Sequence, residues 1–309
     1  MVIPEGIVDL HTHSTHSDGS LSPVDLIYRA AKNGVSVLSI TDHDSVEAYN
    51  QELTLTAASS SGIELVTGVE VSSQFRGKGL HILGLFIDHS NPELSDMLDT
   101  QQLYRKKYST ELRERFIEGG WLMPKLPIHH LAQTITKAQL AETIITQQNN
   151  VPRLLELFGH VPTRGEFIER LMNPGGTFYL RREHLEPEQV ISVIHAAGGL
   201  AVYAHPIAGL NEGVPMEIVK SALSKLKFDA IEALYYYHNQ SKGGRLVDGI
   251  EQMKQLAEEY HLAISGGSDY HGPNDAHGAQ VEVGFAGFLT YPGIDIFDIL
   301  RSKLHMIKS

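Results

Sequence analysis

Residues 7–19 read IVDLHTHSTHSDG, an apolar run followed by a long polar segment. The run IVDL predicts a buried strand. Ser22 followed by Pro23 predicts the start of a helix, because serine caps helices and proline fits their first position. This helix is expected to end near Gly34, and VSVLSI at residues 35–40 predicts the next strand. Since the connection is too long for a hairpin, the segment predicts a parallel strand, helix, strand unit of an α/β fold.

The same alternation continues along much of the chain. Further strands are predicted at residues 63–71, 81–86, 200–204, 229–234 and 262–265. Helices are predicted at residues 187–197, 216–226 and 244–260. Seven strands with helical connections predict an α/β barrel.

A helical segment interrupts this alternation between the fourth and fifth strands. Its predicted helices cover residues 93–118, 137–148, 153–158 and 164–171, separated by glycines and prolines. We therefore divide the chain into a barrel of residues 1–91 and 178–309 and a helical insertion of residues 92–177.

Composition restricts the chemistry of the protein. The 309 residues include 25 Lys and Arg against 37 Asp and Glu, a net charge of −12 that disfavours nonspecific attraction to nucleic acid or anionic membranes. The absence of cysteine excludes thiolate ligands, so a metal must bind nitrogen and oxygen. The sequence has no leader-like start and no apolar run long enough to cross a bilayer. We therefore expect a soluble, cytoplasmic protein.

Metal-ligand side chains follow the predicted strands. His11 and His13 stand two residues apart, so strand periodicity turns both imidazoles to the same side, where they can share one ion. In barrel enzymes the carboxyl ends of the strands meet at one face, which brings distant residues together. Burying so many ionisable groups without a metal would be costly. The sequence therefore predicts a cluster of divalent ions on His11, His13, Asp18, His43, Glu70, His81, His205, Asp269 and His271.

Each of these residues also has a structural interpretation. Asp18 would cap a turn, Glu70 would pair with an arginine, and Asp269 would begin a helix. Accepting all such interpretations requires many coincidences at successive strand ends, which favours the metal cluster. A structural or supporting role is preferred for other polar residues nearby, namely His16, Asp42, Asp44, His238 and His277.

Six motifs carry a resemblance to a known family. They read DLHTHSTHSDG at residues 9–19, TDHD at 41–44, GVEVS at 68–72, HILG at 81–84, AHP at 204–206 and GSDYHG at 267–272. By these motifs the chain resembles the PHP (polymerase and histidinol phosphatase) superfamily of metal-dependent phosphoesterases. Its length and helical insertion look most like the branch of nucleoside 3′,5′-bisphosphate phosphatases and 5′-3′ exoribonucleases.

The resemblance implies a distorted seven-stranded (β/α)7 barrel, the PHP fold, with two or three divalent ions per chain. Mn²⁺, Zn²⁺ and Fe²⁺ all suit nitrogen and oxygen ligands. One ion would bind His11, His13, Glu70 and Asp269, a second would bind Glu70, His81 and His205, and a third would bind Asp18, His43 and His271. A hydroxide that bridges the ions, held by Glu70, Asp269 and His205, would attack phosphorus.

These features predict a metal-dependent phosphoesterase. The expected substrate is a small phosphorylated molecule, namely a nucleotide or the 5′ end of a short RNA, with neither a membrane nor a stable nucleic-acid partner. Motifs of serine hydrolases, P-loop NTPases, dinucleotide-binding enzymes and zincins are absent from the sequence. Two alternatives stay open: a phosphatase of another small metabolite such as histidinol phosphate, and a non-catalytic binding module stabilised by metals.

The insertion is expected to act as a lid that contacts the substrate. Where the resembled branch has an Arg-x-His motif, this chain has Lys137, which keeps the positive charge without the guanidinium fork. Lys137 is the leading candidate for a phosphate contact. Weaker candidates for substrate binding are Arg153, Arg164, Arg181, Arg182 and His238. A stacking surface for a nucleobase is expected from Tyr179, Arg181, Tyr236 or Tyr237.

Overall fold

The computed structural model describes residues 6–123, 137–239, 245–273, 282–284 and 296–308. The chain forms two compact units, one of Met1–Leu98 and Leu185–Ser309 and one of Asp99–His184. The first boundary falls inside the long helix α3 (Pro92–Glu118) and the second just before α7 (Pro187–Ala196). The second unit thus overlaps the expected insertion of residues 92–177 and extends to His184.

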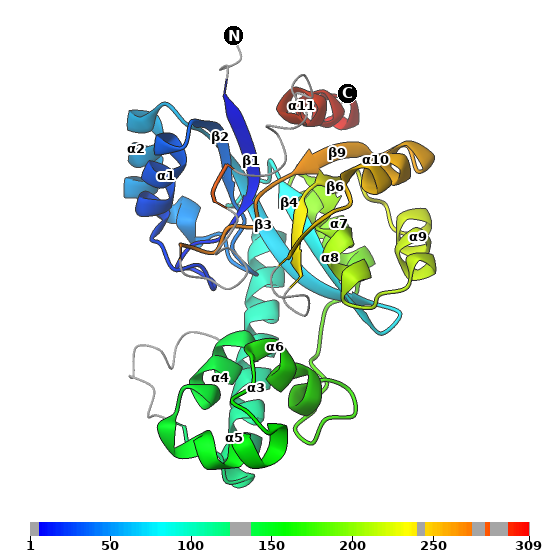
Figure 1. Ribbon diagram of the computed structural model, residues 1–309. Coiled ribbons are helices and arrows are strands. Elements are labelled where there is room, and N and C mark those ends of the chain that lie inside the picture. Colours follow the sequence, from blue (N-terminus) through cyan, green and yellow to red (C-terminus); the bar gives the residue numbers. More distant parts are fainter. Residues whose placement is uncertain (1–5, 124–136, 240–244, 274–281, 285–295, 309) are drawn as a thin grey trace. The chain divides into compact units, whose positions relative to one another are not determined.

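A seven-stranded sheet forms the centre of the first unit (Figure 1). Its strands follow the order β1-β2-β3-β4-β5-β6-β9. They are β1 (Ile7–Thr12), β2 (Val35–Ile40), β3 (Glu64–Phe75), β4 (Lys78–Leu85), β5 (Leu200–Tyr203), β6 (Ala230–Leu234) and β9 (Ala263–Gly266). All seven coincide with predicted strands, although β1, β3 and β4 are longer than predicted.

The segment after β9 joins the two edges of this sheet. Thr12 pairs in parallel with Tyr270, and the backbone N–H of Asp269 donates to the His11 carbonyl at 2.8 Å. The N–H of His13 donates to the Tyr270 carbonyl at 2.9 Å. Because β1 and β9 are the outermost strands, these bonds bring the sheet round into the predicted barrel-like fold.

Strand β4 runs against its neighbours. It is antiparallel to both β3 and β5, whereas the other neighbouring strands of the sheet are parallel. Arg76 and Gly77 join β3 to β4 in a tight turn with φ values of 49° and 78°, which suits a hairpin. A hairpin, rather than a helix, therefore connects these two strands. The antiparallel direction of β4 also places His81 opposite Ser72 of β3, near the carboxyl ends of the neighbouring strands.

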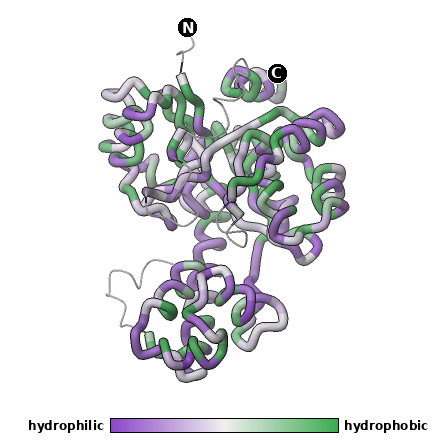
Figure 2. The backbone as a smooth tube through the Cα atoms, viewed as in Figure 1, coloured by the Kyte–Doolittle hydropathy of each residue, from purple (hydrophilic) through white to green (hydrophobic). Residues whose placement is uncertain are grey.

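Helices surround the sheet of the first unit. They are α1 (Pro23–Lys32), α2 (Glu52–Ser61), α7, α8 (Pro206–Asn211), α9 (Met216–Lys225), α10 (Ile250–Glu259) and α11 (Ile296–Lys308), with a 3₁₀ turn η1 (Glu47–Asn50). The Ser22 side chain accepts a hydrogen bond from the Asp25 N–H at 3.1 Å, as expected for the cap of α1. Figure 2 shows apolar residues along the central strands and polar residues on the outer turns of the helices. One apolar core joins the sheet to α11, and a second joins it to α1 and α2.

The second unit is helical and has its own core. The helix α3 is followed by α4 (Lys137–Ile145), η3 (Gln148–Asn150), α5 (Val151–Phe158), α6 (Arg164–Phe167) and the π turn η4 (Ile168–Met172). Phe116 stacks on Phe178 with ring centroids 4.2 Å apart and on Phe167 at 5.8 Å. Thr163 and Glu166 form a reciprocal capping box that begins α6.

The predicted helix over residues 244–260 is wrong at its start. β8 (Arg245–Asp248) occupies the first part and pairs antiparallel with β7 (Tyr236–Asn239), and α10 begins only at Ile250. The aromatic residues of β7 and Val247 of β8 favour strand, and Gly249 separates the strand from the helix. Among the described residues, no helix combines the length and the apolar character that crossing a membrane requires.

Candidate metal centre

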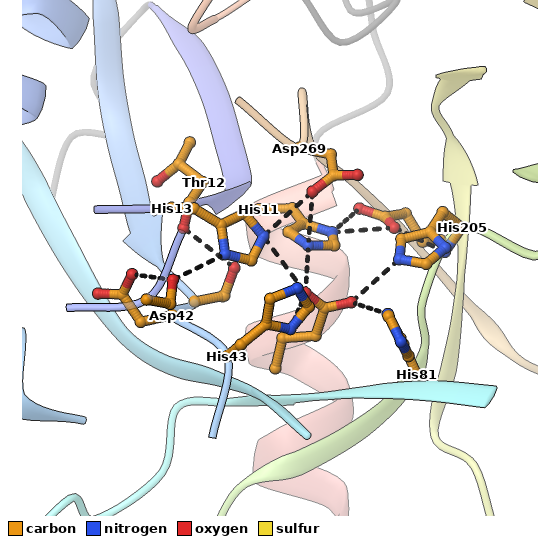
Figure 3. A network of polar contacts seen from close by, with 12 residues as sticks. His11, Thr12, His13, Asp42, His43, His81, His205 and Asp269 are labelled. Carbon is orange, nitrogen blue, oxygen red and sulfur yellow. Dashed lines mark hydrogen bonds and ion pairs between the residues drawn. The ribbon is translucent and has the colours of Figure 1, made fainter. Parts of the chain in front are cut away.

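The nine predicted ligands gather at one end of the barrel. His11 lies in β1, Glu70 in β3 and His81 in β4, and the other six lie in segments that follow β1, β2, β5 and β9. Glu70 is near the end of the strand predicted at residues 63–71, and His81 begins the strand predicted at residues 81–86, but in the structure both lie inside longer strands. Figure 3 shows His11, His13, His43, His81, His205 and Asp269 pointing toward one another.

The carboxylate of Glu70 lies at the centre of this cluster and is almost fully buried. Its Oε1 lies 2.7 Å from His81 Nδ1 and 3.0 Å from His205 Nε2. Its Oε2 lies 3.1 Å from His43 Nδ1 and 3.3 Å from the Nε2 atoms of His11 and His13. The two oxygens therefore face different sets of histidines, an arrangement in which one carboxylate can serve two ions.

Two further carboxylates face the histidines on either side of Glu70. Asp269 Oδ1 lies 3.1 Å from His13 Nε2 and 3.3 Å from His11 Nε2. Asp18 Oδ1 lies 3.3 Å from His271 Nε2. His13 Nδ1 and His43 Nε2 lie at a longer distance of 3.8 Å from the Asp18 carboxylate.

Three groups of donor atoms each lie within 4.8 Å of one another. They are His13, Asp18, His43 and His271; His11, His13, Glu70 and Asp269; and His43, Glu70 and His81. Two groups contain the sets that the resemblance implied for the first and third ions. The third contains His43 where the resemblance implied His205, which lies 3.0 Å from the same Glu70 oxygen as His81.

Charges in the cluster compensate one another. Burial by itself would raise the pKa of Glu70. The charges of the surrounding histidines, with the largest effect from His43, instead hold this pKa well below its usual range. The pKa values of Asp18 and Asp269 are likewise held well below normal by adjacent histidines. Burial opposes protonation of His205, but its hydrogen bond to Glu70 raises the pKa to about 9. In the metal-free protein, histidine protons therefore supply the positive charge that divalent ions would bring.

Several donor atoms lack hydrogen bonds, which tests whether the site fits metal ions. His11 Nε2, Glu70 Oε2 and Asp18 Oδ1 are buried and make no hydrogen bond of acceptable geometry within the described part of the chain. Buried polar atoms are normally satisfied, and unsatisfied ones require an explanation such as an absent ion. Nitrogen and carboxylate donors at this spacing suit borderline divalent cations. The cluster is therefore able to hold metal.

Comparison with known proteins identifies the family. The PHP domain family matches residues 9–115. A 5′-3′ exoribonuclease of Haemophilus influenzae is 32% identical over 265 residues, which are 86% of this chain and 90% of that protein. The chain belongs to the PHP domain family. A 3′,5′-nucleoside bisphosphate phosphatase of Chromobacterium violaceum is 26% identical over 271 residues, 87% of this chain and 88% of that protein.

A solved structure shares the fold of this PHP protein. It is a Bifidobacterium adolescentis protein described as a metal-dependent phosphoesterase, with a TM-score of 0.72 and 20% identity over 97% of each chain. Family membership and the His, Asp and Glu cluster together make this chain a metal-dependent PHP phosphoesterase.

Buried aspartates hold the ligand loops of the PHP domain. Asp9 Oδ1 accepts from the Ser268 N–H at 2.9 Å, and Asp9 Oδ2 accepts from Ser268 Oγ at 2.6 Å and the Gly284 N–H at 2.8 Å. These bonds tie β1 to the segment that carries Asp269. The sequence predicted no role for Asp9, although a charged residue inside the apolar run IVDL is a signal for a buried polar contact.

Asp42 has the supporting role that was preferred for it. Its Oδ1 accepts from the Ser14 N–H at 2.7 Å and from Ser17 Oγ at 2.6 Å, and its Oδ2 accepts from Ser14 Oγ at 2.6 Å. The loop between His13 and Asp18 is thereby fixed by one carboxylate.

The other polar residues near the motifs have separate surroundings. His16 Nε2 lies 2.7 Å from the Gln51 amide nitrogen, and Asp44 accepts from the Ser72 N–H at 3.1 Å. His277 lies outside the described residues. His238 is buried in β7, and the Tyr237 hydroxyl donates to Glu212 at 3.1 Å. Tyr236 is half-buried in β7.

Basic candidates in the second unit differ in their surroundings. Lys137 Nζ donates to Asn173 Oδ1 at 3.1 Å, and burial together with Arg182 lowers its pKa. Arg153 donates to the Gly119 carbonyl at 2.6 Å and lies 4.5 Å over the Trp121 ring, contacts that build the helical core. Two more candidates, Arg164 and Arg182, are half-buried, while Arg181 and Tyr179 are exposed.

Proposed function

We propose that this phosphoesterase hydrolyses phosphate esters of nucleotides, either nucleoside 3′,5′-bisphosphates or the 5′ end of short RNA. The cluster of metal-ligand candidates supports ester hydrolysis in general. The choice of a nucleotide substrate is supported by the distribution of charge between the two units. The second unit has twelve Lys and Arg against nine Asp and Glu, whereas the first unit has 13 against 28. Formal charges of +3 and −15 in one chain favour a polyanionic ligand for the second unit.

The names of the relatives support the same substrate class. One relative is named as an exoribonuclease and another as a nucleoside bisphosphate phosphatase. Both names describe phosphoester cleavage on a nucleotide with more than one phosphate. Because these names point to nucleotides or RNA, the nucleotide proposal is the one to test first.

In the proposed reaction, the nine clustered residues would hold the ions, and Glu70 would bridge two of them. Bound divalent ions supply a water of lowered pKa and neutralise charge on the phosphate. Glu70, Asp269 and His205 would hold the ions that activate the attacking water, and no protein nucleophile would be required. Substrate selection falls to the cationic second unit, with Lys137 as the leading phosphate contact.

A substrate panel tests this proposal. The protein, reconstituted separately with Mn²⁺, Zn²⁺ and Fe²⁺, is assayed with nucleoside 3′,5′-bisphosphates, 5′-phosphorylated oligoribonucleotides, histidinol phosphate and p-nitrophenyl phosphate. The highest kcat/KM is expected for one of the two nucleotide classes. A preference for histidinol phosphate, or equal turnover of all four, would contradict the nucleotide assignment.

A paired substitution tests the role of the second unit. Lys137→Ala removes a half-buried cation, and Lys106→Ala removes an exposed cation of the same unit as a control. Loss of a charge-assisted contact of about 1.5–3 kcal/mol lowers kcat/KM roughly ten- to a hundredfold on the bisphosphate. Turnover of p-nitrophenyl phosphate should stay unchanged. Equal losses on both substrates, or the same effect from Lys106→Ala, would remove Lys137 as a selective contact.

A further inference from the structure

Glu232 is a fully buried acid in β6, the one strand of the described sheet with no predicted metal ligand either within it or in the segment that follows it. It stands in the middle of β6, AIEAL, whose other residues are apolar and buried. A buried carboxylate is costly unless charged or polar partners surround it. Within the described residues, none of the groups that could hold a metal ion includes Glu232. Its position therefore calls for a role other than direct ligation.

Both oxygens of Glu232 contact one metal-ligand candidate. Glu232 Oε1 lies 3.0 Å and Oε2 lies 3.1 Å from His11 Nδ1. Because an ionised carboxylate can only accept, this contact places a proton on Nδ1. The other ring nitrogen, Nε2, is then left for an ion, and it lies 3.3 Å from both Glu70 Oε2 and Asp269 Oδ1. Glu232 thus selects the tautomer of His11 that can bind a metal in the cluster.

The same carboxylate also holds the backbone of a second ligand candidate. The N–H of His205 donates to Glu232 Oε2 at 2.7 Å. His205 has a φ of 29°, a conformation that residues with a side chain rarely adopt. Such a conformation persists only where surrounding bonds enforce it. The bond to Glu232 is one such restraint, and it keeps His205 Nε2 at 3.0 Å from Glu70 Oε1.

We propose that Glu232 is a positioning residue that orients His11 and His205 at once, on the two sides of the Glu70 carboxylate. A carboxylate is required because both partners are donors. Glutamine has a single acceptor oxygen, so in Glu232→Gln one of the two donors would face an amide NH₂ group. Aspartate keeps the charge but is one methylene shorter and cannot reach both donors.

The chain offers a matched control in the residue directly before the same strand. Asp229, directly before β6, also accepts from a histidine ring and a backbone amide: His195 Nε2 at 2.7 Å and the Ala201 N–H at 2.8 Å. Asp229 and Glu232 are three residues apart, so strand periodicity turns them to opposite faces. Asp229→Asn therefore repeats the chemical change of Glu232→Gln away from the cluster.

The test measures metal binding in the full-length protein, independently of any substrate. Competition with a chromophoric chelator gives the Kd for Mn²⁺ and Zn²⁺, elemental analysis gives the number of ions, and ¹⁵N NMR of the Zn²⁺-loaded protein reports which His11 ring nitrogen carries the proton. Glu232→Gln is expected to weaken metal binding by roughly ten- to a hundredfold with the number of ions unchanged at saturation, and to shift the His11 ring ¹⁵N signals. Glu232→Asp should show the same loss, and Asp229→Asn should bind metal like the wild type.

Three results would overturn the proposal. Wild-type affinity in Glu232→Asp would show that only the charge matters. Loss of one whole ion in Glu232→Gln would make Glu232 a ligand. An equal loss of affinity in Asp229→Asn would indicate a general effect on the barrel. Should Glu232→Gln fail to fold, the Glu232→Asp measurement decides alone. Because no substrate is used, failure here is distinguishable from failure of the nucleotide assignment.

Discussion

Gly267→Ala should disrupt the metal centre although Gly267 carries no ligand. A Cβ at this position would stand 2.2 Å from the His11 Cβ and 2.5 Å from the His11 backbone nitrogen. Ordinary contact begins near 3.4 Å, so the two backbone segments would have to separate by about 1.2 Å. Both segments carry ligand candidates, since one contains His11 and the other contains Asp269, two residues after Gly267. The hydrogen bond from the Asp269 N–H to the His11 carbonyl fixes the distance between the two segments.

The expected cost follows from this displacement. Overpacking in a well-packed core costs about 1–3 kcal/mol, which lowers Tm by about 2–12 °C for a unit of this size. A displacement of about 1 Å at a reacting centre costs roughly a hundredfold in rate. Metal affinity should fall as well, since His11 and Asp269 share one group of donors.

Calorimetry, metal titration and kcat/KM on a phosphoester measure these three effects. Gly79→Ala in β4 is the matched control, because nothing lies within 4 Å of a Cβ built there. It should leave all three quantities near wild type. A Gly267→Ala protein with wild-type Tm and activity would refute the argument, as would equal losses in both variants.

Three further predictions concern the cluster itself. Glu70→Gln and Asp269→Asn should each lower kcat/KM by at least about a hundredfold, whereas His16→Ala should lower it less than about threefold; equal losses would mean that the first loop is misassigned. Tyr235→Phe removes the hydroxyl that donates to Asp269 Oδ2 at 3.1 Å, and should weaken metal binding about tenfold without changing the number of ions, as measured by chelator competition. The raised pKa of His205, about 9 in the metal-free protein, has two consequences with pH. Below that pKa a proton competes with the metal ion for His205. Between pH 7 and 9 the affinity of the protein for metal should therefore rise about tenfold per pH unit for each proton that the metal displaces. Over the same range the metal-free protein should lose stability in urea, because a raised histidine pKa stabilises the fold only while the proton is bound; a flat affinity profile would contradict this sign.

Much of the barrel could be predicted because its strands are apolar runs that end in polar residues. His11, His43 and His205 follow this pattern, and their convergence follows from the geometry of parallel strands. The direction of β4 could not be predicted in the same way. A mainly apolar run such as HILGLF is equally compatible with a parallel and with an antiparallel strand. Only the short turn at Arg76 and Gly77 indicates a hairpin.

Supporting residues were harder to find than ligand candidates. Glu232 and Tyr235 belong to an apolar segment whose local pattern describes a core strand, and their partners lie far away in sequence. A single buried acid in AIEAL shows that some partner must exist without showing which one. At β8, pairing with the neighbouring strand β7 takes the place of the first turn of the predicted helix.

The place of the second unit in the chain constrains how the barrel is completed. Ile82 of β4 pairs with Tyr203 of β5, so the second unit lies within one long connection, residues 86–199, between two adjacent strands. Within that unit, Lys107 Nζ lies 2.6 Å from Glu183 Oε1 and Arg115 donates to the Tyr179 carbonyl at 3.1 Å, which keeps its two ends side by side. A folded second unit thereby shortens the effective loop and lowers the entropy lost when β5 docks. During synthesis β4 stays an unpaired edge until β5 emerges, and His205, Asp269 and His271 emerge last. The full set of nine ligand candidates is therefore available only after the segment that follows β9 has been synthesised.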